Sequence, residues 1–155
     1  MTGTVAARLA EKGITLPEAV TPVAAYVPWV ITGNLLFISG QVPFKDGSLS
    51  HTGHLGGNVS VDEGYDCARV CALNILAQVN EALNGDLDRV SRVVKLTGFV
   101  ASTPDFGDQP KVINGASDLM AEAFGDNGRH ARAAVGVAAL PMNCAVEVEA
   151  IFELV

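Results

Sequence analysis

The order of hydrophobic patterns predicts an α+β fold in which two helices pack on one face of a mixed sheet. Short β-prone runs bounded by glycine and proline alternate with two longer segments whose apolar residues recur at helical spacing. The predicted order is β-β-α-β-α-β-β, which suits two layers around one core. With 155 residues, 49% of them hydrophobic, the chain is long enough to bury such a core.

The N-terminal residues 1–21 are predicted to be a helical extension and connector that precede a single domain, residues 22–155. Within the extension, residues 4–12 have the pattern of a short helix, and Gly13 ends it. Two prolines that follow, Pro17 and Pro22, indicate an extended connector.

A hairpin is predicted at the start of the domain. Residues 26–32 and 35–39 are β-prone, and Gly33-Asn34 between them favours a tight turn. The following residues 45–58 hold four glycines and two histidines without periodicity and are interpreted as a loop.

Two helices are predicted in the domain. Ser60 is followed three residues later by Glu63, which predicts a capping box at the start of a helix that runs to about Leu83. Residues 110–124 have the second helical pattern. The apolar stripe of the first helix comprises Val61, Tyr65, Ala68, Cys71, Ala72, Ile75, Val79 and Leu83.

Three further strands are predicted, at residues 90–101, 132–139 and 145–154. The last two flank a turn at Leu140-Pro141-Met142-Asn143 and are interpreted as a hairpin. In that hairpin Arg132 would face Phe152, about five residues or roughly 16 Å from the level of Glu147. Arg132 is therefore expected to meet Glu147 of a neighbouring chain, unless a bulge shifts the register.

One face of the predicted sheet has no helix to cover it. Val135, Val137, Val146 and Val148, or their alternating neighbours, would be exposed there. An apolar face of this kind usually meets a partner, and symmetric self-assembly is the common solution. The sequence therefore predicts a homo-oligomer.

Charge and composition exclude several classes of protein. The net charge of −7 argues against a protein built to bind nucleic acid. The N-terminus does not have the pattern of a signal peptide, and apolar runs are too short to cross a bilayer. Three sparsely spaced cysteines fit a reducing compartment. We expect a soluble cytoplasmic protein with neither a membrane nor a nucleic acid as partner.

No metal and no cofactor are predicted. His51 and His54 are close in sequence but lack a third nearby ligand, and His130 is distant. Cys67 and Cys71 are four residues apart and are expected on the buried face of a helix. The sequence contains neither a nucleotide-binding glycine motif nor the serine elbow of hydrolases.

The residues that could perform chemistry are polar side chains at strand and helix positions. Arg132 opens an apolar strand, and a guanidinium can bind a carboxylate through a bidentate fork. The alternative is an ordinary surface arginine. Glu147 alternates with Glu149 along the last strand, and the alternative is a solvated face. Tyr26, Ser39 and Asn114 are further candidates that are scattered along the chain. For Asn114 the alternative is an ordinary surface position on its helix.

Taken together, these motifs resemble the RidA/YjgF family, also called the Rid or L-PSP family. The resemblance covers residues 22–153 in colinear order. The matching pieces are Tyr26-Val27, Gly33-Asn34, Ile38-Ser39-Gly40-Gln41-Val42-Pro43, Asn114, Ala131-Arg132, Leu140-Pro141 and Val146-Glu147-Val148-Glu149-Ala150-Ile151.

The resemblance implies a chorismate mutase-like fold and a homotrimer with sites in the clefts between subunits. It also implies hydrolysis of reactive enamine and imine intermediates, such as 2-aminoacrylate, to 2-keto acids and ammonia. This activity requires no cofactor, and its substrate is a small molecule that bears a carboxylate.

The resemblance also implies a role for individual residues. Arg132 matches the arginine that binds the substrate carboxylate, and Glu147 matches the acidic residue near the hydrolytic water. Cleft-lining positions of the family are matched by Tyr26, Ser39, Gly40 and Asn114.

Two positions near these residues depart from the family pattern. Ala134 stands where the archetype has a cysteine, although alanine keeps the backbone carbonyl that is proposed to hold water. Trp29, after Pro28, replaces a smaller and more polar residue and is expected near the cleft. The glycine-rich residues 47–58 and the N-terminal extension also differ, so the resemblance leaves the identity of the substrate open.

Alternative functions stay open at this point. The same trimer could bind a carboxylate through Arg132 without turnover, as a sensor or regulator. A hydrolase for a larger carboxylated substrate is another alternative. An endoribonuclease, a label long attached to the family, is disfavoured by the net charge of −7.

Overall fold

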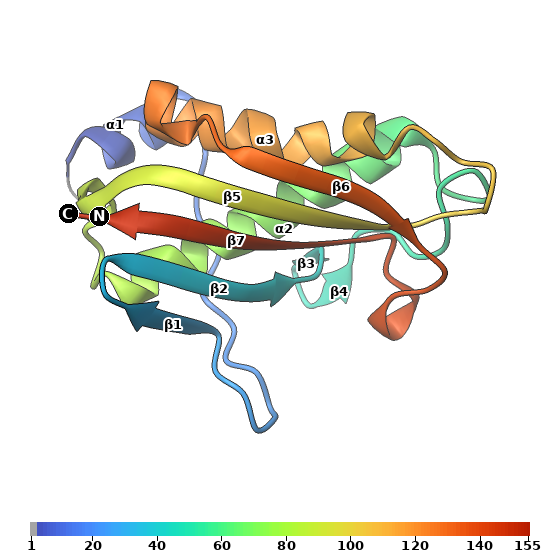
Figure 1. Cartoon of the computed structure of the whole chain (residues 1–155), viewed down its shortest axis with the longest axis horizontal. Coiled ribbons are helices and arrows are strands. Elements are labelled where there is room, and N and C mark those ends of the chain that lie inside the picture. Colours follow the sequence, from blue (N-terminus) through green and yellow to red (C-terminus); the bar gives the residue numbers. More distant parts are fainter. Residues whose placement is uncertain (1–2) are drawn as a thin grey trace.

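A computed structural model describes residues 3–155 as a five-stranded mixed sheet with helices on one face (Figure 1). This confirms the predicted α+β class. The strand order is β1-β2-β7-β5-β6. The strands are β1 (Trp29–Thr32), β2 (Leu35–Gln41), β5 (Val90–Ala101), β6 (Ala131–Val137) and β7 (Val146–Leu154). The helices are α1 (Thr4–Glu11), α2 (Val61–Ala82) and α3 (Gln109–Phe124).

Short elements connect these parts. Residues 45–58, predicted as a loop, contribute to a small separate hairpin of β3 (Phe44–Lys45) and β4 (Ser48–Leu49). Three 3-10 turns are η1 (Leu87–Arg89), η2 (Gly125–Gly128) and η3 (Pro141–Asn143). Among the helices of residues 3–155, none has both the length and the hydropathy that a membrane crossing requires.

The pairing of the last two strands differs from the prediction. Strands β6 and β7 do not form a hairpin, because β5 lies between them. Leu96 of β5 pairs with Arg132 in the parallel β5–β6 ladder and with Ala150 in the antiparallel β5–β7 ladder. The helical crossover through α3 allows β5 and β6 to pair in parallel. The η3 turn then carries the chain to the other side of β5, so Arg132 does not face Phe152.

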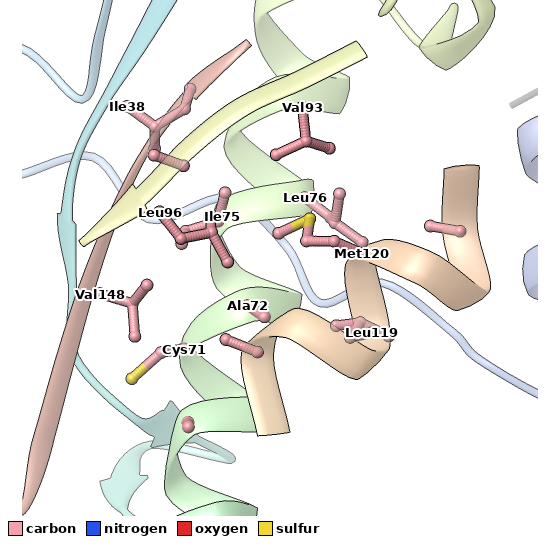
Figure 2. Packing of buried hydrophobic residues seen from close by; sticks show 14 of the residues in the cluster. Ile38, Cys71, Ala72, Ile75, Leu76, Val93, Leu96, Leu119, Met120 and Val148 are labelled. Carbon is pink, nitrogen blue, oxygen red and sulfur yellow. The ribbon is translucent and has the colours of Figure 1, made fainter. Parts of the chain in front are cut away.

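The core lies between the sheet and the helix layer. Figure 2 shows Leu96 and Val148 of the sheet next to Ile75 of α2, with Leu119 and Met120 of α3 farther from the strands, to the right. All five side chains are buried. Burial of large apolar side chains at this interface is the main force that stabilises the sheet–helix packing.

Helix α2 begins as predicted. The Ser60 hydroxyl accepts from the Glu63 amide at 3.1 Å, and the Ser60 amide donates to the Glu63 carboxylate at 2.9 Å, which completes the capping box. Helix α3 crosses α2 closely at Gly115, where a β-carbon would overlap the carbonyl oxygen of Tyr65. The two helices therefore form one continuous layer over the sheet (Figure 1).

Hydrogen bonds hold the N-terminal extension against the rest of the domain near both of its ends. Asp88 accepts from the amides of Thr4 and Val5 at 2.8 and 2.9 Å and so caps α1. Further along, the Gln78 side chain of α2 is buried and donates to the carbonyl of Val20 at 2.7 Å. The segment that follows projects beyond β1 at the lower edge of the view in Figure 1, and Val23 within it is fully exposed.

The second face of the sheet is open, as expected from the number of helices. Val146 and Val148 are buried on the helix side, so their alternating neighbours Glu147 and Glu149 lie on the open face. Val135 lies on that face too and is 44% exposed. The open face therefore mixes apolar residues with two adjacent carboxylates.

Candidate functional site

Arg132 is held by helix α3 at the edge of the sheet. It pairs with the buried Leu96, so its side chain is on the helix side of strand β6. The Arg132 Nη1 donates to the Asn114 side-chain oxygen at 2.8 Å and to the Ser117 hydroxyl at 3.1 Å. Asn114 and Ser117 are three residues apart and share one face of α3. Within residues 3–155 no carboxylate pairs with Arg132. The other N–H donors of its guanidinium group are therefore available to an anion.

His130 extends this network by one further step. One of its ring nitrogens contacts the carbonyl of Gly128 at 2.6 Å and the other contacts the Ser117 hydroxyl at 2.9 Å. Burial lowers the pKa of His130, and the nearby Arg132 lowers it further. A neutral imidazole that donates to Gly128 and accepts from Ser117 leaves the Ser117 oxygen free to accept from Arg132.

Ser117 and His130 are two site residues that the sequence interpretation missed. The signals were present: Ser117 follows Asn114 at helical spacing, and His130 precedes Arg132 by two residues, which is the spacing of one strand face.

Glu147 lies on the other face of the sheet. It pairs with Phe99 of β5 and is half-buried. Burial raises the pKa of Glu147, and the charge of Glu149 adds to this. Its Oε1 fills the place that a β-carbon of Gly40 would occupy. In the described part of the chain no hydrogen-bond donor reaches this carboxylate, so it is available to a water molecule or a ligand.

A β-bulge places Gly40 beside Glu147. Strand β2 pairs with β7 at Ile38↔Ala150 and again at Gln41↔Val148, so one extra residue lies in β2 between these pairs. The extra length contains Ser39 and Gly40. The Ser39 hydroxyl donates to the Val27 carbonyl at 2.8 Å, and its amide donates to the Pro28 carbonyl at 2.9 Å. These bonds fix the segment that carries Tyr26.

A pocket of about 200 Å³ opens between this bulge and the N-terminal connector. Three predicted site residues line it together: Tyr26, Ser39 and Gly40. Trp29 does not line it, because Trp29 pairs with the buried Ile38 and packs against the core. The other lining residues come from the connector, the end of β2 and helix α2, and include Val20, Pro22, Val42, Phe44 and Asn74.

The predicted site residues thus form two separate groups within one chain. Arg132 and Asn114 are together on the helix side, and Ala134, two residues along β6, also faces that side and is partly buried. Glu147 is on the open face of β7, two strands away from β6. Along the strand direction it is displaced from Arg132 by three residues. The separation is about 10 Å across the strands and about 10 Å along them. One chain therefore does not bring Arg132 and Glu147 together.

The other polar candidates have local partners. The His54 ring bonds the carbonyl of Ala138 at 2.7 Å. Cys67 and Cys71 are buried, as predicted, and desolvation raises the pKa of both thiols. Within residues 3–155 no group of three or more His, Cys, Asp or Glu side chains is arranged to hold a metal ion.

Comparison with known proteins identifies the family. The family model described as "YjgF/chorismate mutase-like, putative endoribonuclease" matches residues 6–154. The chain belongs to the YjgF family. The match begins within α1 and covers the rest of the N-terminal extension as well as the sheet and its helices, and the chorismate mutase-like fold agrees with the observed architecture.

Two relatives from this comparison match nearly the whole chain. Protein TCP17 of Trypanosoma cruzi is 53% identical over 153 residues, which are 98% of this chain and 95% of the relative. The crystal structure of protein Atu1372 from Agrobacterium tumefaciens, whose function is unknown, is 54% identical with a TM-score of 0.91. That comparison covers 97% of this chain and 92% of the other.

A third relative has a name that states an activity. The 2-iminobutanoate/2-iminopropanoate deaminase of Dermatophagoides farinae is 33% identical over 143 residues, covering 89% of this chain and 92% of the relative. The family therefore includes a protein named as an imine deaminase.

Proposed function

We propose that this protein hydrolyses 2-imino acids to 2-keto acids and ammonia in clefts between the subunits of a homotrimer. The observation that carries the proposal is the pair of Arg132 and Glu147, each available to a ligand: Arg132 is oriented by Asn114, and the Glu147 carboxylate lies against Gly40 on the other side of the sheet. The family's deaminase relative from Dermatophagoides farinae supports the chemistry.

Arg132 is the proposed anchor for the substrate carboxylate. Its Nη1 is oriented by Asn114 and Ser117, and a carboxylate can bind through the remaining donors of the guanidinium. An anchored carboxylate fixes the position of the adjacent imine carbon, which lowers the entropic cost of attack by water. The reaction requires no nucleophilic side chain.

Glu147 is the proposed base for the water. Its raised pKa brings it closer to the range in which a carboxylate can accept a proton efficiently near neutral pH. Water adds to the imine carbon while Glu147 accepts one of its protons, and Glu147 then passes this proton to the nitrogen to give an amino alcohol. The hydroxyl proton of the amino alcohol moves to the departing nitrogen, so ammonia leaves and the keto acid remains. An enamine enters the same route after it tautomerises to the imine.

The separation of the two residues supports a shared site. Because Arg132 and Glu147 lie on opposite faces of one sheet, a complete site requires the Arg132 side of one subunit to meet the open face of another. The open face is suited to such contact, since Val135 and Phe37 are exposed on it. A closed ring of three subunits would repeat this contact three times.

Imine hydrolysis by the purified protein tests the proposal. An amino-acid oxidase supplies the imino acid, semicarbazide traps what remains, and the protein is expected to reduce the trapped fraction. Arg132→Ala should lower kcat/KM by about 100-fold or more, because a charge-assisted bidentate contact is lost.

Arg129→Ala is the matched control. Arg129 is close in sequence and lies on the surface, where it pairs with Asp126 at 3.8 Å. Its loss should leave the rate unchanged. No acceleration by the wild-type protein across several imino acids would refute the proposed reaction and favour a carboxylate-binding trimer without turnover.

A further inference from the structure

The N-terminal connector forms one wall of the pocket next to Gly40. Val20 and Pro22 of the connector line the pocket opposite the bulge of β2. This wall is fixed, because the buried Gln78 side chain donates to the Val20 carbonyl at 2.7 Å. Without this partner the buried Gln78 amide would be left without a hydrogen bond, which would lower the free energy of unfolding. The contact therefore keeps the connector in place.

The opposite wall is anchored to the same helix. The Asn74 side chain donates to the carbonyls of Val42 and Phe44, each at 3.0 Å. Two amides of α2, one helical turn apart, thus set the distance between the connector and the segment after β2. The pocket is therefore built by the fold and does not depend on a mobile loop.

The chemistry of the lining is mainly aliphatic and aromatic. Val20, Pro22, Val42 and Phe44 present apolar surface, together with the ring of Tyr26. The volume of about 200 Å³ is space open to the centres of water-sized spheres, and one water molecule needs roughly 10 to 15 Å³ of such space. A three-carbon imino acid, whose side chain is one methyl group, would leave most of this space unused.

We infer that this pocket is a side-chain subsite that selects 2-imino acids with an aliphatic chain of about three to four carbons, and that Val20 of the connector sets this selectivity. The inference rests on the proposed function for its reaction. Its geometric basis is Gly40, which contacts the Glu147 carboxylate and also lines the pocket. Glu147 does not itself line the pocket, so the inference places the imine carbon at Glu147 and the substrate's side chain past Gly40 in the pocket. Glu18, a charged lining residue, disfavours an anionic chain.

A chain-length series tests the subsite. The substrates are the imino acids made from alanine, 2-aminobutyrate, norvaline and norleucine. We expect kcat/KM to rise by about fourfold for each added methylene, because each leaves water for an apolar wall. The Val20 side chain lines the pocket and is 67% exposed, so Val20→Phe places a larger ring at the pocket and should remove this rise.

Val23→Phe is the matched control. It adds the same ring to the same connector, but Val23 is fully exposed and does not line the pocket. The rise with chain length should persist in this variant. If wild type shows no rise, or if Val20→Phe and Val23→Phe keep the same chain-length profile, the subsite is refuted.

Binding measured by calorimetry separates the subsite from the reaction. The ligands are the corresponding 2-keto acids, from pyruvate to 2-oxohexanoate. Affinity that rises with chain length in wild type and not in Val20→Phe supports the subsite even where no imine is turned over. Turnover of the alanine-derived imine with no dependence on chain length would refute the subsite and leave the proposed reaction standing.

Discussion

Replacing Gly40 with alanine is expected to disable hydrolysis while leaving the fold intact. A β-carbon at this position would overlap Oε1 of Glu147 and lie 3.1 Å from its Cδ and 3.3 Å from its Cγ. Carbon atoms pack favourably at about 3.5 to 4.0 Å, so the carboxyl group must move by roughly 1 Å. Gly40 does not have a positive φ, so alanine imposes no backbone strain there.

The displacement sets the size of the effect. A catalytic group moved by about 1 Å can lose about 100-fold in rate, because the water it holds no longer points at the imine carbon. The free energy of unfolding should change little, since Glu147 is only half-buried and can turn toward solvent. We therefore expect kcat/KM to fall by about 100-fold, with the melting temperature within roughly 3 °C of wild type.

Steady-state imine hydrolysis and thermal unfolding measure the two effects. Gly107→Ala is the control, because a β-carbon at Gly107 meets no atom within 4 Å and its φ is not positive. Activity of Gly40→Ala within twofold of the control would refute the argument that the position of the Glu147 carboxylate depends on the absence of a side chain at residue 40.

Two further predictions concern the two halves of the site. Ser117→Ala removes one of the two oxygens that orient Arg132 and should raise KM by about tenfold, the value of one hydrogen bond to a charged group; an unchanged KM for the imino acid would contradict this role. Glu149→Gln removes a charge that raises the pKa of Glu147. Because the base acts when deprotonated, the acid limb of the kcat/KM profile should move to lower pH, and a limb that stays in place or moves up would show that another group titrates there.

The elements of the fold were predictable because each carries its own periodicity. The capping box at Ser60 and the stripe of the long helix depend on residues a few positions apart, which a sequence displays directly. Strand pairing is different. Alternation in residues 145–154 shows which side chains share a face but not which strand lies beside them, so the insertion of β5 between β6 and β7 was missed.

The site was predictable as a set of residues and not as an arrangement. The residue pattern singled out Arg132 and Glu147 and the resemblance gave them roles, but their opposite faces depend on the register of both strands with β5. Gly40 was identified as a position, while the reason for glycine there is the Glu147 carboxylate, which the fold brings from more than a hundred residues away. Trp29 was expected near the cleft, and its pairing with Ile38 directs it to the core.

Complementation between two inactive variants tests the shared site most directly. Arg132→Ala and Glu147→Gln subunits, coexpressed with different tags, would assemble into mixed trimers. If each site takes Arg132 from one subunit and Glu147 from its neighbour, random assembly leaves about one quarter of sites intact. The account predicts that imine hydrolysis returns to about a quarter of the wild-type rate in the mixture. No recovery in verified mixed trimers would contradict it, because both residues would then have to come from the same subunit.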